Sequence, residues 1–200
     1  VGFMSENIIN HFGKTYAGMD LDYVVEDKPL GTGGAVSLAM TKCKHDHVFV
    51  LNGDTYIDLE VDLIYEHWAK RGNPIIVAKR VADTARYGRL VVQEGLVSGF
   101  TEKGISGDGF INAGCYVFSP SVIDEIAPNT VVSIERETFP HLVSSGKKVF
   151  GFVDQSYWLD IGTPKALMKG SRDLVSGLAD APALRSAKVM SHSPESVVMH

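Results

Sequence analysis

Cysteine, clustered basic residues and long apolar runs are all scarce in this 200-residue sequence. The two cysteines, Cys43 and Cys115, form no C-x-x-C motif, so we expect free thiols in a reducing cytosol rather than a disulfide or a sulfur-ligated metal. No window approaches the roughly 18 consecutive apolar residues of a membrane-spanning helix. A net charge of -5 without a Lys/Arg block gives no electrostatic signal for nucleic acid or anionic membranes. These absences predict a cytoplasmic protein that binds neither nucleic acid nor membranes.

Several common catalytic motifs are also missing. The histidines show no H-x-x-x-H or H-E pattern, which argues against a zinc site. No serine or cysteine lies in a G-x-S-x-G elbow, so the common hydrolase template is excluded. Neither G-x-G-x-x-G nor G-x-x-x-x-G-K-[ST] occurs, which excludes an NAD-type Rossmann domain and a P-loop.

The composition that remains is typical of a folded protein. Hydrophobic residues make up 44% and charged residues 22% of the chain, which argues against disorder. We expect one domain over residues 1–177 with a single substantial core. Residues 178–200 are small, polar and aperiodic, and are predicted to form a tail or packing arm.

The pattern of apolar residues predicts an α/β fold with a mixed sheet. Residues 21–26, 35–40 and 47–52 read as a strand-helix-strand unit, with the last strand apolar on both faces as in a parallel sheet. A hairpin through Glu94 and Gly95 would add antiparallel strands. The other predicted strands are 75–79, 111–118 and 148–153, and the other helices are 5–12, 58–72, 120–126, 134–145 and 164–176.

Two aspartates are candidate metal ligands. Asp54 follows the strand 47–52, and polar residues at the carboxyl ends of strands are where ligands collect in parallel α/β sheets. Taken alone, Asp54 is more typical of a turn or helix cap. Asp160, in W-L-D-I-G-T-P, occupies a matching loop before the last helix, where Thr163 is the natural N-cap. Two carboxylates in matching places favour a shared Mg²⁺ site.

Polar residues after one other strand and at the start of the next could contact a substrate. Glu102 and Lys103 follow the strand 96–100; they could bind sugar hydroxyls and a phosphate, or form an ordinary solvated pair. Asn112 and Gly114 offer an amide and a close backbone approach, or a turn at the start of a strand.

A glycine-rich stretch and a short R-Y-G segment complete the set of candidates. Residues 30–35, L-G-T-G-G-A, would form a loop that accepts a planar base, or simply a tight turn before a helix. The segment 86–88 could line a sugar pocket or form the entrance to the hairpin.

In order along the chain, P-L-G-T-G-G-A, V-L-N-G-D, R-Y-G, F-x-E-K, I-N-A-G-C-Y-V-F and W-L-D-I-G-T-P resemble the sugar-1-phosphate nucleotidyltransferase family. The resemblance covers about residues 21–176 and is greatest to D-glycero-α-D-manno-heptose 1-phosphate guanylyltransferases, then to mannose-1-phosphate guanylyltransferases. It implies a Rossmann-like mixed, mostly parallel sheet flanked by helices. It also implies that a sugar 1-phosphate attacks GTP to give GDP-sugar and pyrophosphate. A homodimer is compatible with the sequence but is not indicated by it.

The resemblance also implies residue roles. Asp54 and Asp160 would hold Mg²⁺ and, with Lys103 on the sugar phosphate, would carry catalysis. No general base is needed because a sugar phosphate is already anionic, and such transfers depend on alignment and charge neutralisation. The nucleotide site would comprise Leu30, Gly31, Thr32, Gly33, Gly34 and Gly53. The sugar site would comprise Tyr87, Gly88, Glu102, Asn112 and Gly114.

One part of the family pattern is missing from this sequence. In the family, the signature G-G-x-G-T-R and the P-K that follows it contact the triphosphate and lie upstream of all the motifs above, and this sequence has no such upstream segment. We therefore expect that roughly 50 residues carrying that segment precede this sequence in the natural protein, and that the chain alone forms no GDP-sugar. Two alternatives stay open, namely a non-catalytic sugar-nucleotide-binding regulatory module and a thymidylyl- or uridylyltransferase of the same family.

Overall fold

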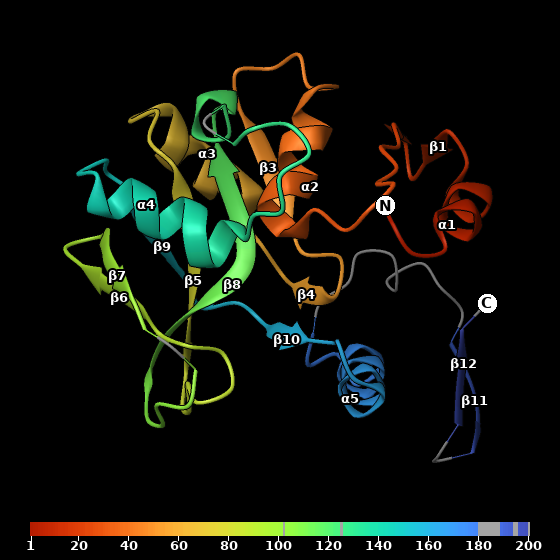
Figure 1. Cartoon of the computed structure of the whole chain (residues 1–200). Coiled ribbons are helices and arrows are strands. Elements are labelled where there is room, and N and C mark those ends of the chain that lie inside the picture. The colour runs from red at the N-terminus through yellow and green to blue at the C-terminus, as the bar shows by residue number, and fades with distance from the viewer. Residues whose placement is uncertain (102, 125, 180–188, 194–195, 200) are drawn as a thin grey trace.

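The computed structural model describes residues 1–101, 103–124, 126–179, 189–193 and 196–199, and its main body is a six-stranded mixed sheet with helices on both faces (Figure 1). The strand order is β3-β8-β5-β9-β7-β6. These strands are β3 Val48–Leu51, β5 Ile75–Val81, β6 Leu90–Gln93, β7 Leu96–Phe100, β8 Gly109–Phe118 and β9 Phe150–Asp154. The helices are α1 Ser5–Phe12, α2 Gly31–Met40, α3 Val61–Ala69, η1 Pro120–Val122, η2 Ile134–Thr138, α4 Phe139–Ser144 and α5 Pro164–Val175.

The mixed sheet is confirmed, but its neighbouring strands pair mostly antiparallel, whereas mostly parallel pairing was expected. In the described part of the chain, only β5 and β9 pair in parallel. Strands β3, β5, β9 and β6 do point in one direction. The long strand β8 runs the opposite way between β3 and β5, so its pairings with both are antiparallel.

Three local expectations are also corrected. Residues 21–26 lie outside any strand and bond to the first residue instead, since Val1 donates its amine to Val24 O at 2.7 Å. The strand-helix-strand unit expected there is therefore not formed. Helix α2 begins at Gly31, so the stretch 30–35 is mostly helical rather than a loop. The expected loop 157–163 contains β10, Trp158–Asp160, which pairs antiparallel with β4, Thr55–Ile57.

Other expectations are confirmed where the local signal is strong. Helix α1 has the expected bounds, and β6 and β7 form the hairpin through Glu94 and Gly95, whose φ angles are 50° and 77°. Positive φ at both positions is the backbone of the tight hairpin turns that match strand twist. Thr163 caps α5 by accepting a hydrogen bond from Ala166 N at 3.2 Å.

The sheet separates two apolar clusters because successive side chains of a strand point to opposite faces. In β5, Ile76 packs with α4 and η2, whereas Ile75 and Val77 pack with Ile64 of α3. Strand β8 follows the same alternation and is buried along most of its length. The two clusters hold the sheet between α3 on one face and α2, η2 and α4 on the other (Figure 1).

The two ends of the chain add small two-stranded elements. Strands β1, Thr15–Tyr16, and β2, Met19–Asp20, pair beside α1, and β11, Val189–Ser193, pairs with β12, Ser196–Met199, within the expected tail. Across the described residues, no helix combines the length and the apolar character needed to cross a membrane.

Candidate functional site

The two predicted metal ligands lie side by side. Asp54 ends the turn after β3, and Asp160 ends β10. Strand β4 pairs with β10 so that Thr55 opposes Asp160, and Ile161 N donates a hydrogen bond to Asp54 O at 2.9 Å. The antiparallel pairing of two short strands therefore brings together residues more than a hundred positions apart in the sequence.

The two carboxylates face a common point next to Gly162. A Cβ atom at this glycine would lie 3.0 Å from Asp160 Oδ1 and 3.4 Å from Asp54 Oδ2. Gly162 N also donates a hydrogen bond to Asp160 Oδ1 at 3.0 Å. The glycine thus leaves open a space lined by two carboxylate oxygens, which any side chain would fill.

This donor set fits Mg²⁺. The part of the chain that the structure describes contains no cluster of three or more His, Cys, Asp or Glu able to hold a metal. Mg²⁺ commonly binds through one or two carboxylates and keeps water and substrate phosphates as its other ligands. The space between Asp54 and Asp160 is suited to that kind of site.

The second oxygen of Asp160 is engaged by an arginine. Arg86 Nη2 lies 3.0 Å from Asp160 Oδ2, and the two side chains are 55% and 24% exposed. The residue that follows, Tyr87, packs edge-on against Trp158 with ring centroids 5.3 Å apart. The R-Y-G segment therefore joins the aspartate pair to the neighbouring cavity.

An open cavity of about 970 Å³ is lined by Asn52, two residues before Asp54, and by Tyr87, which packs on Trp158, although neither aspartate lines it. This volume is at the upper end of what small-molecule sites usually have, about 300 to 1,000 Å³. Predicted site residues that line it are Thr32, Tyr87, Gly88, Lys103, Asn112 and Gly114. Lining residues that the sequence did not indicate include Asn52, Arg89, Tyr116, Ser133, Glu135 and Arg136. The predicted sugar site is thus gathered at one cavity, except for Glu102, which lies outside the described residues.

The glycines assigned to the nucleotide do not line this cavity. A Cβ atom at Gly34 would lie 2.4 Å from Thr130 O, and Gly33 N donates a hydrogen bond to Val132 O at 2.8 Å. The small residues let α2 approach the backbone of residues 130–132, and Thr32 alone of the stretch 30–34 reaches the cavity. Leu30, Gly31 and Gly53 are likewise absent from the cavity wall.

A hydrogen-bonded network forms one wall of the cavity. Asn112 Nδ2 donates to Tyr116 Oη at 2.8 Å, and Tyr116 Oη donates to Glu135 Oε1 at 3.2 Å. Thr32 Oγ1 donates to the other oxygen, Glu135 Oε2, at 2.7 Å. Burial, together with the charge of Glu135, raises the pKa of Tyr116 well above its ordinary value, so the phenol stays a donor. The network holds the side chains of Asn112 and Glu135 in fixed positions at the cavity wall.

Three cationic side chains line the cavity, and they differ in what they bind. Arg89 holds the neighbouring loop through bonds from Nε to Thr84 Oγ1 at 2.8 Å and from Nη2 to Ser106 O at 3.0 Å. Within the described part of the protein, the side chains of Lys103 and Arg136 make no hydrogen bond or ion pair. These two cations are therefore available to a phosphate.

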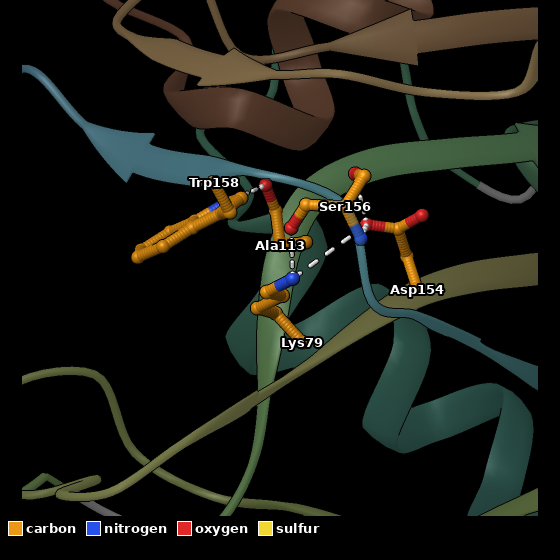
Figure 2. A network of polar contacts seen from close by, with 5 residues as sticks. All are labelled: Lys79, Ala113, Asp154, Ser156 and Trp158. Atoms are coloured by element: carbon orange, nitrogen blue, oxygen red, sulfur yellow. Dashed lines mark hydrogen bonds and ion pairs between the residues drawn. The ribbon is translucent and has the colours of Figure 1, made fainter. Parts of the chain in front are cut away.

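The segment that leads to Asp160 is fixed to the sheet by partly buried polar contacts (Figure 2). Lys79 of β5 donates a hydrogen bond to Ser156 O and lies 3.9 Å from Asp154 Oδ2. Asp154 Oδ2 accepts bonds from Ser156 N at 3.0 Å and Ser156 Oγ at 2.5 Å. Trp158 Nε1 donates to Ala113 O of β8 at 3.0 Å, so β10 is tied to the strand that carries Asn112 and Gly114.

Comparison with known proteins agrees with this geometry. Residues 3–177 match the family described as nucleotidyl transferase. The chain belongs to that family. The resemblance identified in the sequence is thus confirmed, and both aspartates and the whole cavity lie within the matched residues of this nucleotidyl transferase chain.

Individual relatives are similar over most of this chain. A mannose-1-phosphate guanylyltransferase of Mycobacterium tuberculosis is 41% identical over 172 residues, which are 84% of this chain and 48% of the relative. A D-glycero-α-D-manno-heptose 1-phosphate guanylyltransferase of Aneurinibacillus thermoaerophilus is 30% identical over 174 residues, which are 86% of this chain and 75% of the relative. The nucleotidyl transferase chain therefore spans about half the length of the first relative and three quarters of the second.

A solved structure shares the fold. HddC from Yersinia pseudotuberculosis, complexed with GMP-PN, superposes with a TM-score of 0.76 at 29% identity, covering 86% of this nucleotidyl transferase chain and 76% of HddC. The expected α/β class of nucleotide-sugar transferase type is confirmed by this likeness.

Proposed function

We propose that this nucleotidyl transferase chain takes part in transferring GMP from GTP to a sugar 1-phosphate of the mannose or manno-heptose type, releasing pyrophosphate. The observation that carries the proposal is the convergence of Asp54 and Asp160 on one point near a cavity whose cations Lys103 and Arg136 have no side-chain partner among the described residues. The names of the relatives, which act on mannose 1-phosphate and heptose 1-phosphate, support guanine and this sugar class.

The residues would divide the work by their chemistry. Lys103 and Arg136 would neutralise and orient the sugar phosphate, which is itself the nucleophile. Asn112 and Glu135 would bind sugar hydroxyls, and the cavity wall would hold the attacking oxygen close to the nucleotide. Asp54 and Asp160 would hold Mg²⁺, which supplies charge neutralisation at the transferring phosphate.

The proposal extends to the cellular compartment and the oligomeric state of the protein. Cys43 is exposed and Cys115 is buried, and both are free thiols, which is compatible with a reducing cytoplasm. A homodimer is the assembly we would test first, by measuring the mass in solution.

Pyrophosphate release tests the proposed activity. The assay is run with Mg²⁺, GTP and mannose 1-phosphate or heptose 1-phosphate on the natural full-length protein in which this sequence occurs. Asp54→Asn and Asp160→Asn are each expected to lower turnover by at least about 100-fold, because a ligand should matter no less than its outer-shell partners, which are worth about 10 to 100-fold. Asp62→Asn, an exposed change on α3, is the matched control and should leave turnover unchanged.

Two outcomes would contradict the proposal in different ways. A double Asp54→Asn, Asp160→Asn variant that keeps wild-type turnover would remove the metal role. Tight binding of GDP-sugar without any pyrophosphate release from wild-type protein would instead support a regulatory binding module.

A further inference from the structure

Arg86 contacts Asp160 of the aspartate pair and directly precedes two residues that line the cavity. Its guanidinium contacts Asp160 Oδ2 at 3.0 Å and lies over the Tyr87 ring, 5.4 Å from the centroid. Tyr87 and Gly88, the next two residues, line the cavity. The Arg86 guanidinium thus contacts the carboxylate while its own backbone leads directly into the cavity wall.

The contact between Arg86 and Asp160 is of a kind that is easily broken. Both side chains reach solvent, at 55% and 24% exposure, and exposed ion pairs contribute little free energy. Asp160 keeps its bond from Gly162 N through the other oxygen when the arginine leaves. Arg89 offers the contrast, because its guanidinium is fixed by Thr84 and Ser106 and has no comparable freedom.

We propose that Arg86 is an exchangeable counter-ion, which neutralises Asp160 while no metal is bound and turns to the phosphate of the sugar 1-phosphate when a divalent cation takes its place. The inference rests on the proposed function, since it requires the metal site and the sugar phosphate. The guanidinium and the cation would use the two oxygens of one carboxylate, Oδ2 and Oδ1, so the positive charge of each weakens the binding of the other. Once the cation neutralises the carboxylates, the arginine fork is free to bind a phosphate, for which its geometry is suited.

Metal affinity in the absence of substrate tests the competition. Mn²⁺ serves as the probe, and free Mn²⁺ is measured by electron paramagnetic resonance with the same natural full-length protein as in the pyrophosphate assay. Arg86→Gln is expected to bind Mn²⁺ about two- to tenfold more tightly than wild type, because a competing ion pair and a nearby positive charge are both removed. Arg86→Lys, which keeps the charge, should stay near wild type.

Matched variants separate a local effect from a general change of charge. Arg80→Gln removes another exposed arginine, paired with Asp108, and should leave Mn²⁺ affinity unchanged. Asp160→Asn should weaken Mn²⁺ binding strongly. If Asp160→Asn binds Mn²⁺ as wild type does, the metal site of the proposed function fails, and that result differs from a failure of the competition alone.

The second arm measures mannose 1-phosphate binding by calorimetry at saturating Mn²⁺. Arg86→Gln is expected to bind the sugar phosphate about tenfold more weakly, the size of one charge-assisted hydrogen bond at its lower limit. Opposite shifts in the two affinities support the exchange. Unchanged Mn²⁺ affinity, or unchanged mannose 1-phosphate affinity, overturns it.

Discussion

One ion pair lies at each end of the segment 154–160, and the two pairs differ chiefly in the exposed fraction of their side chains. At the first end, Lys79 and Asp154 are 15% and 10% exposed, and both contact Ser156 (Figure 2). At the other end, Arg86 and Asp160 are 55% and 24% exposed. The same combination of charges is thus buried and fixed in one place, and open beside a cavity in the other.

Burial determines what each carboxylate can do. A buried charge is costly unless it is paired and hydrogen-bonded, so Asp154 depends on Lys79 and Ser156. The negative charge of Asp154 also acts on a neighbouring group. Burial is the main cause and this charge the second cause that raise the pKa of the Cys115 thiol to about 12. Asp160 meets solvent and can exchange partners. The comparison indicates that the first pair positions the segment, whereas the second is free to take the role that we propose for it.

The largest expected effect concerns the buried pair. Asp154→Ala should lower the free energy of unfolding by about 2–4 kcal/mol, because the largely buried Lys79 loses its counter-ion and Ser156 loses its hydrogen-bond acceptor. Urea denaturation followed by circular dichroism measures this. The neutral double variant Lys79→Met, Asp154→Leu should recover most of the loss, since similar replacements of buried pairs are often neutral. A loss below about 1 kcal/mol for Asp154→Ala would show that the pair is not structural.

Elements with local signals could be predicted from the sequence. The hairpin follows from Glu94 and Gly95, and the cap of α5 follows from Thr163 and Pro164. The nearness of Asp54 to Asp160 was also correctly inferred, although from matching positions rather than from any contact visible in the sequence. What the sequence does not show is the β4 and β10 pairing that produces it, because three-residue strands give almost no periodic signal.

The missed cavity residues depend on contacts between distant parts of the chain. Thr32 and Glu135 are hydrogen-bonded although 103 positions separate them, and I-E-R-E reads only as part of an ordinary helix. The glycine-rich stretch 31–34 has a composition that suits either a nucleotide loop or a packed helix. The structure shows a packed helix, because the backbone of residues 130–132 lies directly against these glycines. The composition of the stretch does not indicate that it will pack against this distant segment.

An intermediate effect is expected at Trp158, between the two ion pairs. Trp158→Phe leaves Ala113 O without its bond from the indole, which should cost about 1–3 kcal/mol in the free energy of unfolding. Trp68→Phe is the matched control, because Trp68 Nε1 is buried without a hydrogen-bond partner among the described residues. A cost for Trp68→Phe equal to that for Trp158→Phe would show that ring size, rather than the bond to β8, accounts for the loss.

The smallest effect on stability is expected at the open pair. Arg86→Gln should change the free energy of unfolding by less than about 1 kcal/mol, because exposed pairs are weak and screened by salt. Urea denaturation at low and high NaCl measures this, and the small difference from wild type should disappear at high salt. A loss as large as that of Asp154→Ala would remove the distinction between the two pairs. Arg86 would then be part of the framework, and a guanidinium held that firmly could not leave Asp160 for a phosphate.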